Sequence, residues 1–448
     1  MSSPTVEPKN ILLLDLWSEK NRGDAAIQIA LVQLVRKRLP GSRITAMAAF
    51  GANQWPALIE EFDETGPLVD DYVGGVRPWL AGPFNSGLLS VPVARKLVSG
   101  SRAFMALSML PLWPIFARAP WLDALLPKSA RRSIVALRSA DLVLWNCRNI
   151  RGESAITEPY AVWGRVYNAL TAILFRKPVA CIGASIWPLR HPFSRALARA
   201  VLGRCVFVST RDRSSYEYAQ SLLRGKSVSV HLLPDLSLSL LADSPRKARQ
   251  LPLEPLRLGL TVVDCHTSGE DARRRYIAAL RGFLMEFLRR DGTEVVLIPQ
   301  VTTRWQPTAR LEEDLLRGLD PARVYRVRGQ PTVDELTALY GSVDFLVATR
   351  MHSAIFALCQ GTPVVTIPYV AGGKWGILDM MGARDLDVPF RDISADSLQL
   401  KVESVWTRRA EILASVQARL PALASAVEAQ VDIPVGIFLT RAKRGCER

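Results

Sequence analysis

Residues 344–382 read DFLVATRMHSAIFALCQGTPVVTIPYVAGGKWGILDMMG, and this stretch decides the fold class. The run Phe345–Ala348 is apolar throughout, which is typical of a strand in a parallel sheet that is covered on both faces. Residues 351–360 are expected to form a helix that ends at Gly361, and a second apolar strand is expected at 364–369. A strand, a helix and a strand in this order predict a parallel α/β sheet.

Three side chains that suit an anionic ligand follow these two strands. Arg350 and His352 stand where the first strand ends and the helix begins, and Lys374 lies in the glycine-containing turn after the second strand. Open α/β sheets bind ligands beyond the carboxyl ends of their strands, where the first turn of a helix offers free N–H groups and a positive dipole end. We therefore expect Arg350, His352 and Lys374 to converge on one ligand.

The rest of the chain repeats the alternation of strands and helices. The expected strands are 11–17, 43–49, 141–145, 178–184 and 206–210 in the first half, with a helix at 24–39, and 258–263, 294–301, 324–327, 344–349 and 363–369 in the second. The proline-rich stretch 251–255 separates the two series and is the expected linker. The pattern predicts an α/β protein of two Rossmann-like domains facing a cleft, the GT-B-like arrangement.

We expect three parts along the chain. Residues 1–250 form the N-terminal Rossmann-like domain, which carries an irregular insertion rich in Pro, Gly and Trp at about 54–139. Residues 251–395 form the C-terminal Rossmann-like domain, and residues 396–448 form C-terminal helices and a basic tail. A chain of 448 residues, 49% of them hydrophobic, is long enough to bury two cores of this size.

The net charge of +15 predicts a surface that attracts anions such as phosphorylated donors, nucleotide- or lipid-linked sugars and acidic lipid. A simpler alternative stays open, in which an arginine-rich chain has a basic solvated surface. No DNA- or RNA-binding motif accompanies the charge, so no nucleic-acid partner is expected. The six cysteines form no Cys-x-x-Cys pair and the four histidines show no metal-ligand spacing, so we expect no metal site and reduced cysteines, as in the cytoplasm.

Residues 103–117, AFMALSMLPLWPIFA, are uncharged and resemble a membrane segment. They are fewer than the roughly 20 residues that span a bilayer, and they contain two prolines. With arginines and lysines nearby, the stretch either docks on an anionic membrane surface or is an apolar insertion packed against the N-terminal domain. Residues 1–10 lack the order of a secretory signal, so we expect a cytoplasmic protein, peripheral to the inner face of the membrane in the first alternative.

Several short motifs follow one another in an order that is characteristic of one enzyme family. They are Asn21-Arg22-Gly23-Asp24-Ala25-Ala26-Ile27, Arg211-Asp212-Arg213-Ser214-Ser215, Pro234-Asp235, Val296-Leu297-Ile298-Pro299-Gln300, Arg350-x-His352, Gly361-x-Pro363 and Lys374. In these motifs the chain resembles the polysaccharide pyruvyl transferase family. At residues 145–149 it departs from the family, which usually has a glycine-rich loop there.

The resemblance implies an enzyme that transfers pyruvate from phosphoenolpyruvate to a saccharide, forming a pyruvate ketal in cell-surface polysaccharide or glycolipid biosynthesis. It implies catalytic roles for Arg350 and His352 and places the donor side on the C-terminal domain and the acceptor side on the N-terminal one. Guanidinium groups bind carboxylates in a bidentate manner, and an imidazole suits protonation of the donor's methylene carbon near neutral pH. Phosphoenolpyruvate is the donor substrate, and no cofactor is expected.

Further substrate-binding residues are expected from the same resemblance. Arg211 matches a donor-site arginine, Lys374 is expected to touch phosphate, and Asn21, Gly23 and Asp24 are expected to contact the acceptor, a free or lipid-linked saccharide. Structural alternatives stay open for most of them: an ion pair of Arg350 with Asp344 or Asp379, an ion pair of Arg211 with Asp212 or Glu217, Lys374 covering the last helix, and Asp24 acting only as a helix cap.

Two other functions fit the same fold prediction. A sugar-nucleotide glycosyltransferase of GT-B architecture would use the basic residues to bind a diphosphate. A catalytically silent binding protein would keep the fold without the chemistry, and the missing glycine-rich loop at residues 145–149 favours that alternative.

Overall fold

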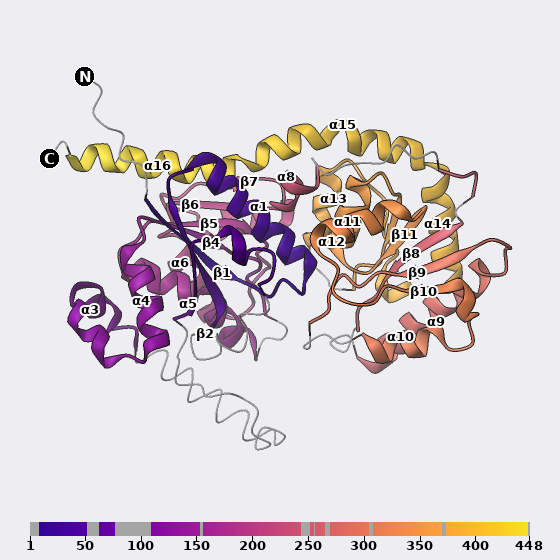
Figure 1. The fold of residues 1–448 in the computed structure, drawn as a ribbon, viewed down its shortest axis with the longest axis horizontal. Coiled ribbons are helices and arrows are strands. Elements are labelled where there is room, and N and C mark those ends of the chain that lie inside the picture. Colours follow the sequence, from indigo (N-terminus) through magenta and orange to yellow (C-terminus); the bar gives the residue numbers. More distant parts are fainter. Residues whose placement is uncertain are drawn as a thin grey trace, which may run out of the picture. The chain divides into compact units, whose positions relative to one another are not determined.

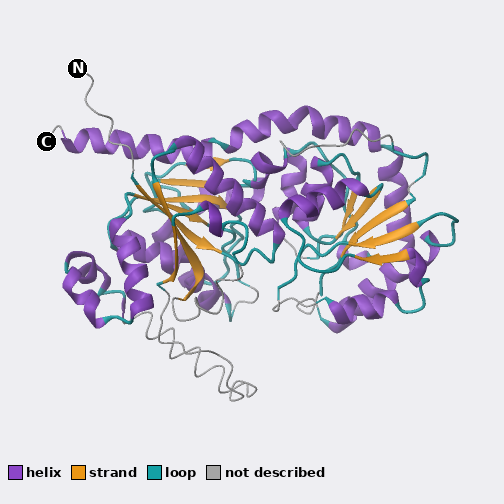
Figure 2. Cartoon of the chain, in the orientation of Figure 1, coloured by secondary structure: helices purple, strands orange, loops and turns teal. Residues whose placement is uncertain are grey.

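The computed structural model describes residues 9–51, 62–76, 109–152, 156–242, 251–254, 256–264, 269–303, 308–369 and 373–446. The chain forms two compact units. Unit 1 comprises residues 1–18, 28–233 and 428–448, and unit 2 comprises residues 19–27 and 234–427. Each unit contains one parallel sheet flanked by helices (Figures 1 and 2).

The sheet of unit 1 has seven parallel strands in the order β3-β2-β1-β4-β5-β6-β7. Their bounds are β1 (Asn10–Leu16), β2 (Arg43–Gly51), β3 (Asp71–Gly75), β4 (Leu142–Asn146), β5 (Val179–Ala184), β6 (Phe207–Thr210) and β7 (Val230–Leu232). The central strands β1 and β4 are almost entirely apolar and buried, which suits strands with helices on both faces.

The helices of unit 1 are crossover connections between its strands, together with one helix from the end of the chain. They are α1 (Arg22–Arg38), α3 (Trp113–Arg118), the short 3₁₀ helix η5 (Pro120–Leu125), α4 (Lys128–Ser139), α5 (Glu158–Leu174), α6 (Pro192–Leu202), α7 (Arg213–Leu222) and α16 (Ala429–Cys446). Helix α16 returns from the end of the chain and packs on β5 and β6. Residues 22–27 at the start of α1 belong to unit 2 and the remainder to unit 1.

The sheet of unit 2 has five parallel strands in the order β10-β9-β8-β11-β12. Their bounds are β8 (Arg257–Thr261), β9 (Glu294–Leu297), β10 (Val324–Arg326), β11 (Phe345–Ala348) and β12 (Val364–Thr366). The helices are α8 (Ser237–Leu241), α9 (Glu270–Phe287), α10 (Ala309–Leu316), α11 (Val333–Ser342), α12 (Met351–Cys359), η8 (Gly373–Gly376), α13 (Ile377–Met380), α14 (Ala395–Thr407) and α15 (Arg409–Val427). The predicted strand at 345–348 and the helix that follows it are confirmed.

Three expectations about element bounds need correction. The first helix begins at Arg22 rather than at residue 24, because residue 21 supplies its cap. The stretch 54–139, expected to be an irregular insertion, contains β3, which completes the sheet, and the helices α3, η5 and α4. The chain enters unit 2 at Pro234 rather than near residue 251, because α8 packs against α12 and α15.

Four cysteines of the described residues, Cys147, Cys181, Cys205 and Cys359, are buried free thiols, as expected from the sequence. Burial raises the pKa of the Cys181 and Cys205 thiols. Both therefore stay protonated at neutral pH and behave as small apolar core residues.

The helical stretch Arg409–Ala442 is, among the described residues, long and apolar enough to cross a membrane by length and composition alone. Core helices of globular proteins pass the same test. Here α15 packs against α8, α12 and α14, and α16 packs against β5 and β6. Part of the stretch serves the cores of the two units, since 28% of its apolar window is buried, and by itself the stretch is weak support for membrane insertion.

Candidate active site

The candidate site lies at the carboxyl end of β11 in unit 2. This strand is fully buried and pairs with β8 on one side and β12 on the other, so the polar residues after it are held at a defined edge of the sheet. Arg350 stands at the position before α12 with extended backbone and a side chain that is only 9% exposed. His352 lies in the first turn of α12, where the helix dipole favours an anion.

Residues 19–27 bring a second segment of the chain to this edge. The backbone N–H of Arg22 donates to the carbonyl of Gln300 at 3.1 Å, and its guanidinium donates to the carbonyl of Gln330 at 3.2 Å. The N–H of Thr302 donates to the carbonyl of Lys20 at 2.8 Å. The segment is therefore fastened by backbone hydrogen bonds to the loop that follows β9.

The backbone of Gly23 packs directly against the imidazole of His352. A Cβ atom at position 23 would lie 2.2 Å from Nδ1 and 2.4 Å from Cγ of that ring, far inside contact distance. Position 23 requires glycine because a larger residue would collide with the His352 ring. Backbone conformation is not the reason, since the φ angle of Gly23 is not positive. Gly23 and His352, both predicted as site residues, therefore lie in contact with each other.

Asp235 lies on the other nitrogen of the same ring. Its Oδ2 is 3.7 Å from Nε2 of His352, and its Oδ1 accepts hydrogen bonds from the backbone N–H of Ser237 at 3.0 Å and from the Ser237 hydroxyl at 2.7 Å. The Asp235 side chain is fully buried, and Nε2 of His352 is buried without a hydrogen bond to any described residue. A fixed carboxylate thus faces the ring nitrogen.

Asp235 was not predicted as a site residue. The sequence contains a signal, because Pro234-Asp235 is one of the motifs that carried the family resemblance. Its contact with His352 joins residues 117 positions apart, and local periodicity carries no information about such a pair.

A buried polar network supports the start of α12. The Tyr340 hydroxyl donates to Oε1 of Gln300 at 2.6 Å, and the Ser353 hydroxyl donates to the same oxygen at 3.3 Å. Burial raises the pKa of Tyr340, although the hydrogen bond with Ser353 and the positive charge of Arg350 oppose this, so the phenol remains a donor. The network ties the turn that carries His352 to the loop that holds residues 19–27.

Asn21 and Asp24 bind each other. Nδ2 of Asn21 donates to Oδ2 of Asp24 at 2.7 Å, and Oδ1 of Asn21 accepts the N–H of Gly23 at 3.3 Å. Asn21 is therefore the cap of α1, whereas Asp24 lies in its first turn. The cap of α1 is therefore Asn21 and not Asp24 as the alternative expected. The hydrogen bond between the two side chains holds the loop that contacts His352.

Asp344 was one of the two expected structural partners of Arg350, but its carboxylate binds backbone N–H groups. Oδ2 of Asp344 accepts the backbone N–H groups of Leu256 at 2.9 Å and Arg257 at 2.7 Å. Asp344 precedes β11 and Arg350 follows it, so the two residues stand at opposite ends of the strand.

Arg211 belongs to unit 1, whereas the cluster around His352 belongs to unit 2. Arg211 directly follows β6, and its Nε donates to the Ser185 hydroxyl at 2.9 Å and its Nη2 to the carbonyl of Arg148 at 3.2 Å. Its neighbour Asp212 caps α7, accepting the N–H of Ser215 at 2.8 Å. The side chain of Lys374 lies outside the described residues. A donor-binding role for Arg211 and Lys374 stays a prediction.

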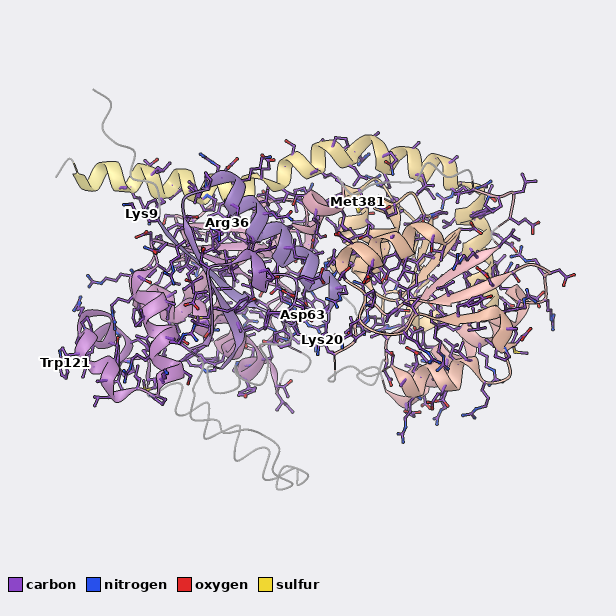
Figure 3. All side chains as sticks on the ribbon, in the orientation of Figure 1. Lys9, Lys20, Arg36, Asp63, Trp121 and Met381 are labelled. Carbon is purple, nitrogen blue, oxygen red and sulfur yellow. The ribbon has the colours of Figure 1, made fainter. Side chains whose placement is uncertain are left out.

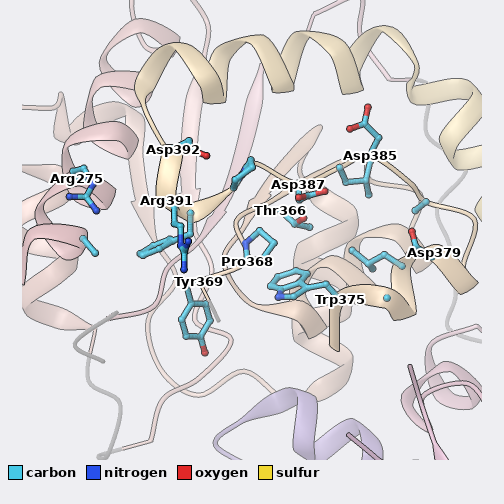
Figure 4. A pocket seen from close by; sticks show the side chains of 17 residues that line it. Arg275, Thr366, Pro368, Tyr369, Trp375, Asp379, Asp385, Asp387, Arg391 and Asp392 are labelled. Carbon is cyan, nitrogen blue, oxygen red and sulfur yellow. The ribbon is translucent and has the colours of Figure 1, made fainter. Parts of the chain in front are cut away.

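A cavity of about 880 Å³ opens next to the carboxyl end of β12 (Figure 4). Aromatic and charged side chains line it, among them Tyr369, Trp375, Asp387 and Arg391. Asp385 also lines the cavity, and its carboxylate accepts a hydrogen bond from Nζ of Lys401 at 2.8 Å. This hydrogen bond lowers the pKa of Asp385. Neither Arg350 nor His352 is among the lining residues, so the buried cluster and this cavity are separate features of the same unit.

Comparison with known families identifies the middle of the chain. Residues 155–369 match the polysaccharide pyruvyl transferase family. The resemblance inferred from short motifs is thereby confirmed. The matched residues include Arg211, Asp235, Arg350 and His352, whereas the segment with Gly23 precedes them.

Several solved structures are similar to this chain over most of its length. A UDP-N-acetylglucosamine 2-epimerase has a TM-score of 0.52 at 13% identity, with 95% of this chain and 94% of that chain covered. A Listeria monocytogenes protein assigned as an enzyme of the same name has a TM-score of 0.53 at 11% identity, covering 91% and 90%. Glycyrrhiza uralensis UGT73P12 has a TM-score of 0.50 at 9% identity, covering 99% and 98%.

At these identities the similarity shows the fold alone. Together with the two parallel sheets it confirms the predicted GT-B-like class of two Rossmann-like α/β domains. The cleft that we expected between them stays a prediction.

Proposed function

We propose that this protein is a ketal-forming pyruvyl transferase that uses phosphoenolpyruvate as donor and a saccharide as acceptor. The observation that carries the proposal is the imidazole of His352, which is lodged between the Gly23 backbone and the buried Asp235 carboxylate, two residues after the buried Arg350. This cluster lies at a helix start that suits an anion, and most of it falls within the residues that match the family.

The chemistry assigns His352 the role of general acid. Its proton goes to the methylene carbon of phosphoenolpyruvate, which leaves a cationic centre at C2. One saccharide hydroxyl adds to C2 and returns its proton to the imidazole. A second hydroxyl of the same sugar then displaces phosphate from C2 and closes the ketal ring, and its proton leaves with the phosphate.

The neighbours of His352 support this role. The carboxylate of Asp235 orients the ring and stabilises the imidazolium that carries the proton, since opposite charges attract strongly at this distance in a buried site. Arg350 provides a guanidinium for the donor's carboxylate or phosphate. The donor then lies mostly on unit 2, with Arg211 and Lys374 as further cations, and residues 21–24 contact the acceptor.

The proposal is tested by phosphate release from phosphoenolpyruvate with a panel of free and lipid-linked saccharides. A pyruvyl transferase releases phosphate only when an acceptor is present, and mass spectrometry finds the ketal on the sugar. A sugar-nucleotide glycosyltransferase releases nucleotide instead, and a binding protein releases neither. Release of nucleotide, or of nothing across the panel, would reject the proposal.

Replacing Asp235 with Asn is expected to lower kcat roughly 10- to 100-fold, because it removes the charge beside the imidazolium. An asparagine oxygen can still accept the hydrogen bonds from Ser237, so the fold should persist. The measurement is kcat and KM for phosphoenolpyruvate, and we expect kcat to fall while KM stays near its wild-type value. The exposed Asp379 replaced with Asn is the matched control. Wild-type kcat in the Asp235→Asn variant would exclude the positioning role.

A further inference from the structure

Residues 109–126 of unit 1, the apolar module, expose several large hydrophobic side chains. The exposed fractions are 75% for Trp121, 73% for Leu125, 51% for Ile115 and 40% for Leu112. Trp121 and Leu125 lie on η5, and Leu112 and Ile115 lie one helical turn apart at the start of α3, which contacts η5. Figure 3 shows Trp121 on the outside of this module. Clustered exposure of this kind marks an interaction surface.

The module is firmly attached to unit 1 by its other face. Trp113, Phe116 and Leu126 are buried, and Nε1 of Trp113 donates to the Tyr167 hydroxyl at 3.1 Å. The ring of Trp113 also lies 6.2 Å from the ring of Phe175 on the same core. The short helices thus bury one apolar face and still display a second, so the exposed residues are not needed for folding.

The charges around the module are positive. Residues 109–132 contain a single acid, Asp123, which is buried and accepts two hydrogen bonds from Arg138 at 2.6 and 2.8 Å. Arg118, Lys128 and Arg131 are exposed in or next to the module. The surface therefore combines exposed apolar side chains with positive charge and has no exposed carboxylate among these residues.

We propose that the apolar module docks on the surface of an anionic lipid bilayer. Trp121, Leu125 and Ile115 enter the headgroup region, where tryptophan is favoured, while Arg118 and Lys128 lie among the lipid phosphates. Each basic residue near an anionic surface strengthens the attraction to it. Charge complementarity favours anionic lipid as the partner. Its acidic headgroups attract the basic residues, and the acyl region beneath them accepts the apolar side chains.

This inference does not depend on the proposed function. The sequence had left open that residues 103–117 dock on a membrane. The structure assigns this role to residues further along the chain. Residues 103–108 lie outside the described part, and Trp113 and Phe116 are buried in the core. The residues that carry the inference, Trp121 and Leu125, follow that apolar stretch.

The test is flotation of the full chain with vesicles of phosphatidylcholine, with and without phosphatidylglycerol. The wild-type protein should float with the anionic vesicles and not with the neutral ones. Changing Trp121 and Leu125 together to Asp should reduce binding at least tenfold, because the apolar side chains that enter the bilayer surface are replaced by carboxylates. Changing Arg118 and Lys128 to Glu should weaken binding and reduce its dependence on salt.

Leu400 on α14 of unit 2 offers a matched control, because it is a leucine with 67% of its surface exposed. Leu400→Asp should bind vesicles as the wild type does, whereas Leu125→Asp should not. All these variants should melt at the wild-type temperature, because the replaced side chains are exposed. Phosphate release with a water-soluble acceptor should also stay unchanged, which separates this test from that of the proposed function.

Three results would overturn the inference. One is unchanged vesicle binding of the Trp121 and Leu125 double variant, and another is an equal loss in Leu400→Asp. The third is a wild-type protein that does not bind vesicles and sediments as a dimer, while the double variant sediments as a monomer. The module would then be a contact between copies of this chain.

Discussion

His352→Ala is expected to lower kcat for phosphate release roughly 100-fold or more, because general acid catalysis by a positioned side chain contributes on that order. The imidazole is held on one side by the backbone of Gly23 and faces the carboxylate of Asp235 on the other. No other histidine of the described residues is part of this cluster. Steady-state rates at saturating phosphoenolpyruvate are the measurement.

The matched control for His352→Ala is His191→Asn. Nδ1 of His191 caps α6 in unit 1 by accepting the N–H of Phe193 at 3.2 Å, and asparagine is also a good cap. This variant should keep wild-type turnover. If His352→Ala were correctly folded by circular dichroism and turned over at the wild-type rate, the acid would have to be another group.

Gly23→Ala is expected to lower kcat by about 100-fold, because a displacement of about 1 Å in a catalytic group costs on that order. The new Cβ would overlap the His352 ring at 2.2 Å, so the ring or the loop must move. The overlap is expected to cost roughly 1–3 kcal/mol of stability, as over-packing does, which leaves the protein folded. A large loss of turnover with only a small fall in melting temperature is therefore the expected signature.

Gly41→Ala is the matched control for this variant, because a Cβ at position 41 would meet no atom within 4 Å. Gly23→Ala should also add little to the loss in His352→Ala, since the two residues act through one contact. Independent, multiplied losses in the double variant, or wild-type activity of Gly23→Ala, would show that the contact does not position the imidazole.

The sequence predicts the centre of the site because its signals are local. An apolar run, a polar end and a helix start place Arg350 and His352 within two residues of each other at the end of β11. The alternation of strands and helices also predicts two parallel sheets. These features depend on neighbours along the chain, which a single sequence displays.

Features that depend on distant segments could not be predicted in the same way. The contact of Asp235 with His352, and the hydrogen bonds of residues 20–22 to residues 300–302, join parts of the chain that periodicity treats separately. The proline-rich stretch at 251–255 misled the boundary prediction, because proline marks loops but not the point at which a chain changes core.

Because residues 19–27 are hydrogen-bonded into unit 2, that unit cannot be produced whole as one continuous fragment. A fragment that starts at Pro234 would carry His352 and Asp235 but lack the strip of backbone that covers the imidazole and pairs with the loop after β9. Such a fragment would leave the carbonyl of Gln300 and the N–H of Thr302 to water. Supplying residues 19–27 as a synthetic peptide, or splicing them to the fragment, restores the missing piece.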